Sequence, residues 1–460
     1  MFYKSVVIFL LALTFTMSSL PLVAQTPTAE VSPESVPELL VKANAAYAVR
    51  DLPTFRQALE SLHKLRPYNS EYMYQLVIAH ALLDEKTEAY NLMLRMQQQG
   101  LAYDFMDSEN TLNIRGTEVF DYLNDLMKMA KEPVGESETI FVLPESIVMP
   151  EAISWDESRQ KFLVGTVAEG QLLAVGKDGQ IDELLKADKE NGMWSIFDIL
   201  VDPSRNRLWV TSASMPVFKH YEPADKGRSA LFEFNLETLE LINKYPVPVD
   251  GQPHLLGTMT LNPDGDVFIA DRILPIIYSK PAAEQKLKPV IALRELVSMR
   301  GIAMQPDGRI MYVADREMGI MVVDLASGRA GLLKGPETLN VGGIDGLYLK
   351  DNRLYVIQNG IKPQRVMRLQ LDASGTKVET VRPMAVAQPE FDLPSFGTIE
   401  GESLYYFASS QRAGKTGPQK PVSVLRTPLD SNEDLVQPEM QHYLEQQAKK
   451  KKQQAEKDEN

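Results

Sequence analysis

The sequence predicts an all-β fold, a six-bladed β-propeller, preceded by a small N-terminal α-helical domain. Two observations lead to this prediction. One strand–turn–strand unit recurs six times in the C-terminal part of the chain, and the hydrophobic pattern before it has a helical period. The chain has 460 residues, more than one hydrophobic core usually organises, so two folded units are expected.

The repeated unit is a strand, a polar turn and a second strand that ends in small or polar residues. Its clearest copies contain the turns at 262–266 and 305–309. Successive copies begin about 46, 60, 43, 45 and 50 residues apart, at Trp155, Val201, Leu261, Met304, Leu349 and Ile399. This is the size of a four-stranded blade. A flat β-sandwich also uses many short strands, but it has no reason to repeat one hairpin at this period.

Residues 37–131 are predicted to form the helical domain, because apolar residues recur there at three- and four-residue spacing. Segments 46–51 and 79–84 are weakly alike at an offset of 33 residues. That period suits paired antiparallel helices resembling tetratricopeptide repeats. The propeller is assigned to residues 140–429, and residues 430–460 are predicted to be a charged, partly disordered tail.

The N-terminus has the pattern of a secretory signal peptide over residues 1–24, with Lys4, an apolar run and a cleavage site near Ala24. Polar residues interrupt the run, which favours cleavage over retention as a membrane anchor. We therefore expect a periplasmic or secreted protein with no membrane span after cleavage, and a linker at 25–36. The chain has no cysteine and a net charge of −14, which disfavours thiolate metal sites and nucleic-acid partners.

The start of each blade's first strand predicts a polar site. First strands run along the central channel, so their starting residues face one mouth of it. These positions are Glu151, Phe197, Gly257, Arg300, Asp345 and Ser395. Charged groups that converge on a concave mouth form either a ligand site or cross-blade ion pairs, and both interpretations remain open here.

The second strands return to the same mouth, where two identical Asp-Arg pairs follow one another in adjacent blades. They are Asp271-Arg272 and Asp315-Arg316. Their repetition favours a structural role in holding blades together.

Segments 149–153, 300–308 and 344–348 resemble the senescence marker protein and gluconolactonase family of six-bladed propellers, and the resemblance covers roughly residues 144–429. It implies one divalent metal, such as calcium or zinc, at the mouth, and hydrolysis of lactones or related esters. The family's first and last metal ligands match Glu151 and Asp345. The remaining ligand position holds Arg300, and the family's substrate-contacting Asn-Asp pair falls on Gly257 and Thr258.

Arginine cannot bind a divalent cation but pairs readily with two carboxylates, so no cofactor is expected and Arg300 is predicted to replace the metal electrostatically. Two functions remain open. The first is an exported cell-envelope binding or scaffold protein, with an unidentified small ligand at the mouth and a protein partner on the helical domain. The second is a lactone or ester hydrolase with a reshaped or metal-dependent centre, in which Glu151 or Asp345 is the general base and Arg300 stabilises the oxyanion.

Overall fold

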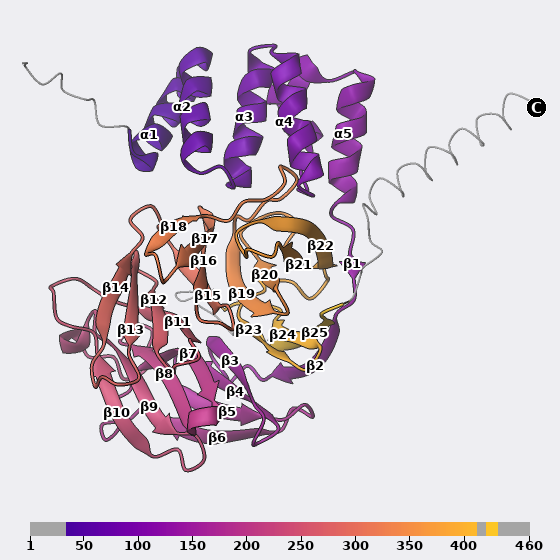
Figure 1. The fold of residues 1–460 in the computed structure, drawn as a ribbon. Helices are drawn as coiled ribbons and strands as arrows, with labels where there is room; N and C mark the ends of the chain where they lie inside the picture. Colours follow the sequence, from indigo (N-terminus) through magenta and orange to yellow (C-terminus); the bar gives the residue numbers. More distant parts are fainter. Residues whose placement is uncertain (1–33, 412–419, 431–460) are drawn as a thin grey trace, which may run out of the picture.

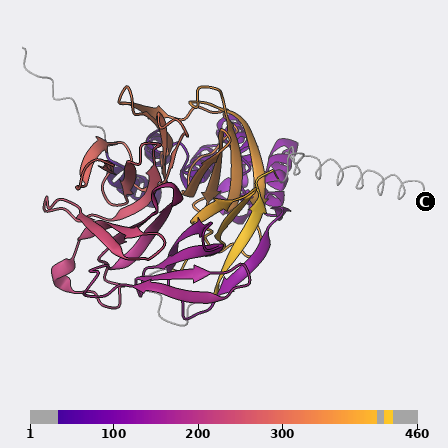
Figure 2. The same ribbon diagram turned by 60° about the horizontal axis from the view of Figure 1, so that its bottom comes forward.

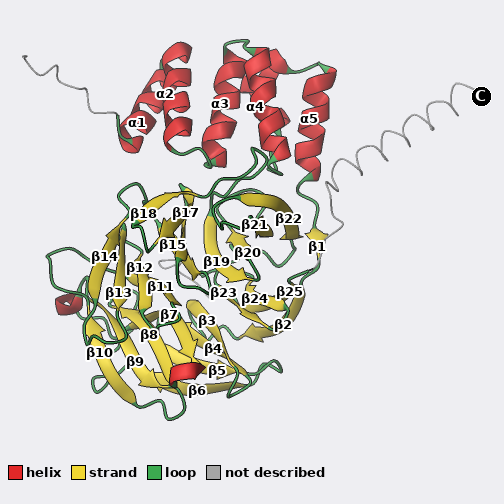
Figure 3. Ribbon diagram, in the orientation of Figure 1, coloured by secondary structure: helices red, strands yellow, loops and turns green. Residues whose placement is uncertain are grey.

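The computed structural model describes residues 34–411 and 420–430. The predicted signal peptide, most of the predicted linker and nearly all of the predicted charged tail lie outside these residues. Within them a group of helices precedes six antiparallel sheets (Figures 1 and 3), so the predicted fold class is confirmed. No helix in this part of the chain is both long enough and apolar enough to cross a membrane.

The helical domain contains two antiparallel helix pairs and one further helix. Its elements are α1 Val36–Ala48, α2 Leu52–Leu65, α3 Ser70–Leu82, α4 Lys86–Gln98, the short 3-10 helices η1 Phe105–Asp107 and η2 Glu109–Ile114, and α5 Glu118–Met129. Local sequence starts these helices: Asp51 accepts the backbone N–H of Thr54 at 3.2 Å, and Asn69 caps α3 in the same way. That they are tetratricopeptide repeats stays a prediction.

Each of the first five blades is built from four consecutive strands, and the first strand of each blade lies innermost. Blade 1 has β3 Pro150–Asp156, β4 Lys161–Thr166, β5 Gln171–Val175 and β6 Ile181–Lys186. Blade 2 has β7 Ser195–Asp202, β8 Arg207–Ala213, β9 Ser229–Asn235 and β10 Leu241–Pro246, and blade 3 has β11 Leu256–Leu261, β12 Val267–Asp271, β13 Ile276–Lys280 and β14 Lys288–Ala292. Blade 4 has β15 Met299–Met304, β16 Ile310–Asp315, β17 Gly319–Asp324 and β18 Arg329–Leu332. Blade 5 has β19 Ile344–Lys350, β20 Arg353–Gln358, β21 Arg365–Leu371 and β22 Val378–Val386.

Strands from the two ends of the propeller close the ring. Blade 6 contains β23 Gly397–Glu400, β24 Ser403–Phe407 and β25 Val422–Pro428, and its outer strand is β2 Glu138–Leu143 from before blade 1. The short β1 Val134–Gly135 extends blade 5. Backbone hydrogen bonds therefore join the first and last strands of the propeller, and the six predicted hairpins link inner and second strands in all six blades.

In the described residues, one apolar cluster of the propeller core lies between each pair of neighbouring blades, and a smaller further cluster around Phe197 joins blades 1 to 3. The alternation of strand residues sends one face of each sheet toward the preceding blade and the other toward the next. Inner strands approach one another most closely where a glycine replaces a side chain. Gly301 on β15 is such a position, because a Cβ there would lie 2.5 Å from Cβ of Leu347 on β19.

The helical domain packs against blades 4 and 5 (Figure 1). The Nε of Arg66 lies 2.7 Å from Oε2 of Glu317, and the backbone N–H of Ala102 donates to the carbonyl of Lys362 at 2.8 Å. Ile361 of the propeller is buried in the core of the helical domain.

These contacts fix which face of the propeller the helices cover. They involve the β16–β17 and β20–β21 loops, which follow the ends of second strands, and that is the side on which the first strands begin. The turned view shows the helices together on one side of the ring (Figure 2). The helical domain therefore lies on the same face as the predicted site.

We expect Gly301→Ala to destabilise the propeller by about 1–3 kcal/mol, because the added methyl group overlaps a neighbouring inner strand. Gly331→Ala is the matched control, since a Cβ at that strand position would meet nothing within 4 Å. Urea unfolding of both variants measures the difference. Equal stabilities would contradict the packing described here.

Candidate functional site

The charged side chains at the channel mouth project from β-bulges in the inner strands. In β3, β7, β15 and β19 the pairing with the second strand skips one residue, and the skipped residues are Glu151, Phe197, Arg300 and Asp345. A bulge re-aims the side chain of its extra residue. Four of the six positions predicted from the repeat alignment are therefore structurally equivalent bulge residues.

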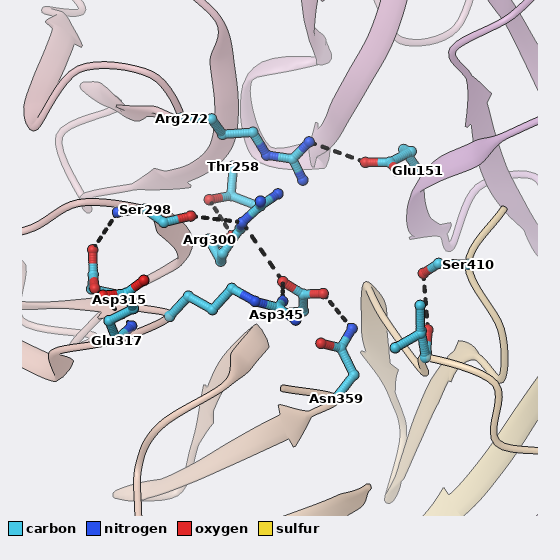
Figure 4. A network of polar contacts seen from close by, with 12 residues as sticks. Glu151, Thr258, Arg272, Ser298, Arg300, Asp315, Glu317, Asp345, Asn359 and Ser410 are labelled. Carbon is cyan, nitrogen blue, oxygen red and sulfur yellow. Dashed lines mark hydrogen bonds and ion pairs between the residues drawn. The ribbon is translucent and has the colours of Figure 1, made fainter. Parts of the chain in front are cut away.

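Arg272 crosses the mouth from blade 3 and pairs with Glu151 of blade 1, with Nη1 3.0 Å from Oε2 (Figure 4). Its guanidinium carbon lies 5.5 Å from the ring centre of Phe197 and 4.6 Å from that of Phe396. The stem of Arg272 lies against Gly257, where a Cβ would be 2.7 Å from its Cγ. The side chain is 6% exposed, and its Nε and Nη2 have no hydrogen-bond partner among the described residues.

Asp345 is the centre of a second group of contacts (Figure 4). Its Oδ1 accepts from Arg316 Nη1 at 2.8 Å, and its Oδ2 accepts from Asn359 Nδ2. The amide of Asn359 also donates to the carbonyl of Pro394 at 2.9 Å, which links blade 5 to blade 6. The Nε of Arg300 lies 3.7 Å from Asp345 Oδ1.

Arg300 is expected to lie within salt-bridge reach of at least one carboxylate, and it lies within reach of Asp345. The second carboxylate, Glu151, is not its partner, and the Arg300 Nε donates to Ser298 Oγ at 3.2 Å. Glu151 is instead held by Arg272. The absence of a side chain at Gly257 permits the pairing of Arg272 with Glu151, because the Arg272 side chain lies where a Cβ at residue 257 would be.

The two Asp-Arg pairs divide their roles. Asp315 accepts backbone N–H groups from Val297 at 2.8 Å and Glu317 at 2.9 Å, and Asp271 ties the corresponding loops of blade 3 in the same way. The structural role predicted for the aspartates agrees with these contacts. Arg272 and Arg316 turn into the mouth and form ion pairs with Glu151 and Asp345 of other blades, which also agrees with the predicted structural role.

A cavity of about 160 Å³ lies in the channel, lined by Arg300 and Asp345 together with Asp198, Thr258 and Tyr348. Sequence reasoning missed Asp198, which immediately follows a predicted ring position. Its signal was a carboxylate within the apolar inner strand that runs from Ile196 to Val201. An ionisable side chain in such a strand faces either solvent or a polar channel.

Burial raises the pKa of Asp198 to about 7, although the backbone N–H groups of Met259 and Ile199 and the charge of Arg272 oppose the rise. The Met259 N–H lies 2.6 Å from Oδ2. Asp198 retains some surface toward the cavity, but protein atoms surround it on every other side, which explains the desolvation. Burial also lowers the pKa of Arg300, assisted by Arg272 and opposed by Asp345.

The residues at the mouth do not fit the divalent metal that the sequence resemblance implies. Glu151 and Asp345 each accept from a guanidinium, and Arg300 contributes positive charge where a third ligand would be needed. Within residues 34–411 and 420–430 no three His, Cys, Asp or Glu side chains form a group that could hold a metal ion. The donor set is that of an ion-pair network.

Comparison with known proteins finds similarity at the level of fold. No protein family matches the sequence, and no curated protein matches it. Among solved structures, a luciferin-regenerating enzyme aligns with 16% identity and a TM-score of 0.45 over 65% of this chain and 97% of that one. Regucalcin, a calcium-binding protein from Agrobacterium tumefaciens, aligns with 15% identity and a TM-score of 0.45 over 62% and 94%. A gluconolactonase from Xanthomonas campestris aligns with 14% identity and a TM-score of 0.42 over 64% and 89%. Gluconolactonases are thus among the structures to which this chain is similar, as its motifs predicted.

We expect Asp198→Asn to stabilise the protein at pH 8.5 by ~1–4 kcal/mol and to have little effect near pH 4. The folded-state pKa of Asp198 lies above its unfolded value of about 4, so its favourable contribution is complete below that pH and is lost as the pH rises from there through about 7. Asn avoids the buried charge and still accepts the Met259 N–H. Denaturant unfolding across this pH range is the measurement, with exposed Asp264→Asn as control; a pH-independent difference would contradict the assignment.

Proposed function

We propose that the protein is an exported binding or scaffold protein of the cell envelope that takes a small anion at the propeller mouth. The observation that best supports this proposal is the set of contacts made by Arg300. Its one hydrogen bond and its ion pair both use Nε, and neither Nη nitrogen has a hydrogen-bond partner in the described part of the chain. A partly buried guanidinium with unused donors beside a cavity is suited to binding a carboxylate through two parallel hydrogen bonds.

The local charge supports the same ligand class. Three guanidinium groups, those of Arg272, Arg300 and Arg316, meet two carboxylates, those of Glu151 and Asp345. Among these five side chains there is one more positive than negative charge, while the two further carboxylates of Asp271 and Asp315, at the ends of second strands, accept backbone N–H groups. Low-dielectric walls concentrate the field of such a group, so a monoanion is attracted to the mouth.

A lactone or ester hydrolase is the second candidate, and it requires a different base from the one the sequence suggested. Glu151 and Asp345 are each held by an arginine, so neither is a carboxylate without a charged partner that could act as the base. Asp198 is the carboxylate with a pKa suited to general-base chemistry near neutral pH, and Arg300 would then stabilise an oxyanion.

The envelope and scaffold parts of the proposal rest on the N-terminal sequence pattern and on the helical domain. A cleaved signal peptide would place the mature protein in the periplasm or outside the cell. Because the helical domain covers part of the mouth face, a protein partner bound to it would lie close to the small-ligand site.

Small carboxylates such as acetate or propionate should raise the melting temperature of the natural protein. At 100 times the dissociation constant, binding adds about 2.7 kcal/mol to the free energy of unfolding. Arg300→Gln should abolish this rise, because the amide lacks the charge and the paired donors. Arg309→Gln is the matched control, since Arg309 sits on an exposed turn and pairs only with Asp324. Retained binding by Arg300→Gln would refute the proposed site.

Calcium and zinc should not raise the melting temperature of the natural protein. Arg300→Asn restores the ligand type that the resemblance implies, but this variant should also stay insensitive to metal, because Arg272 and Arg316 still hold both carboxylates. Thermal unfolding with and without each metal measures this. A metal-dependent rise in the natural protein would return a metal-dependent hydrolase to first place, and a panel of lactones and esters would then identify its activity.

A further inference from the structure

Asp198 faces the cavity that the proposed anion would enter. It lies next to a bulge residue of β7, and its Oδ2 accepts the Met259 N–H of the neighbouring blade at 2.6 Å. The N–H of Ile199 also donates to the carboxyl group. A carboxyl group has about four acceptor positions, so two backbone donors leave it able to make further hydrogen bonds toward the cavity.

The small size of this cavity brings the two charges together. Its volume of about 160 Å³ is close to that of an engineered protein cavity that holds benzene, a molecule of about six non-hydrogen atoms. Arg300 and Asp198 both line this small space, so an anion held there by Arg300 has the Asp198 carboxyl group in the wall of the same cavity. Two carboxylates in so small a low-dielectric site repel strongly, whereas a carboxylic acid and a carboxylate share a proton in a strong hydrogen bond.

We propose that the cavity binds a small monocarboxylate between Arg300 and Asp198, and that one proton is taken up from solvent as the anion binds. This rests on the proposed anion-binding function and specifies its ligand and its regulation. In the complex, the ligand carboxylate accepts hydrogen bonds from the Arg300 Nη groups and from the protonated Asp198 carboxyl. The proton adds to an Asp198 oxygen, no covalent bond between heavy atoms changes, and net charge is conserved.

The groups around Asp198 support this proton site. Arg272 follows β12, the second strand of blade 3. Its positive charge opposes protonation of Asp198, but it is already paired with Glu151. From β15 comes Arg300, and from β19 come Asp345, which is held by Arg316, and Tyr348. The tyrosine is uncharged at neutral pH because burial raises its pKa. The cavity-lining residues from β3 and β23, among them Ser154 and Thr398, are not ionisable, and no lysine or histidine lines the cavity among the described residues.

Calorimetric titration of the natural protein with propionate, between pH 6 and pH 8.5, tests the proposal without any variant. The ligand is an anion throughout this range. Titrations in two buffers of different ionisation enthalpy count the protons taken up, and we expect the count to approach one above pH 7.5. The dissociation constant should rise about tenfold per pH unit above pH 7, because only the protonated fraction of Asp198 is competent to bind. Succinate, a dianion at the upper end of this range, should bind at least tenfold more weakly there.

Asp198→Asn separates this inference from the proposed function. The Asn amide is a permanent neutral donor, so the variant should bind propionate with an affinity independent of pH and with no proton uptake. Asp264→Asn, on an exposed turn, should keep the natural pH profile. Propionate binding by the natural protein without proton uptake would overturn the inference and leave anion binding intact. Failure of the natural protein to bind any small carboxylate at any pH would overturn both.

Discussion

Charge buried at the channel mouth has to be compensated within the protein, and the arrangement of the site follows from this requirement. The bulges of the inner strands turn two carboxylates and one guanidinium toward the channel mouth, where these side chains are partly buried. Two more arginines then enter from the ends of second strands. Glu151 and Asp345 each have a guanidinium partner, while the Nη nitrogens of Arg300 have no hydrogen-bond partner among the described residues. The anion binding proposed for the site depends on these unused donors.

The same network ties blades together. Asp345 receives Arg316 from blade 4 and Asn359 from its own blade, and Asn359 continues to a carbonyl of blade 6. Arg272 connects blade 3 to blade 1. A propeller has few covalent connections between blades, so these cross-channel contacts add to the apolar clusters that hold neighbouring sheets. Removing one partner would leave a buried charge unpaired, which is the costly way to disrupt such a network.

The sequence was sufficient for the architecture and for the positions of the mouth residues, because both depend on repetition. A hairpin that recurs at blade length specifies the number of blades, and its register specifies which residue in each blade faces the channel. Partner choice within the mouth has no periodic signal. The pairing of Glu151 with Arg272 depends on how far a side chain reaches across the channel and on the space above Gly257.

Asp198 shows a second limit of sequence reasoning. The residue before it, Phe197, is the bulge position, so alignment of the repeats pointed one residue away from the carboxylate that lines the cavity. The shifted pKa arises mainly from burial in the closed ring, and two of the groups that oppose it, Met259 and Arg272, come from another blade and are distant in the sequence. A single carboxylate in an apolar strand could have been noted as unusual, but that it lines one cavity with Arg300 follows only from the closed ring.

A short series of contacts joins the channel mouth to the helical domain, on which we propose that a protein partner binds. Arg316 binds Asp345 with its side chain, while the next residue, Glu317, holds Arg66 of the helical domain. The backbone N–H of Gly343 donates to the Arg316 carbonyl at 2.7 Å, and the Gly343 carbonyl accepts the N–H of Asn359 at 3.0 Å. The loops that position the Asp345 contacts are therefore the loops that the helices rest on. Any partner that shifts the helical domain has to shift these loops or break their hydrogen bonds. If the partner thereby changes the affinity of the mouth for its ligand by some factor, linkage requires that the ligand change the affinity for the partner by the same factor.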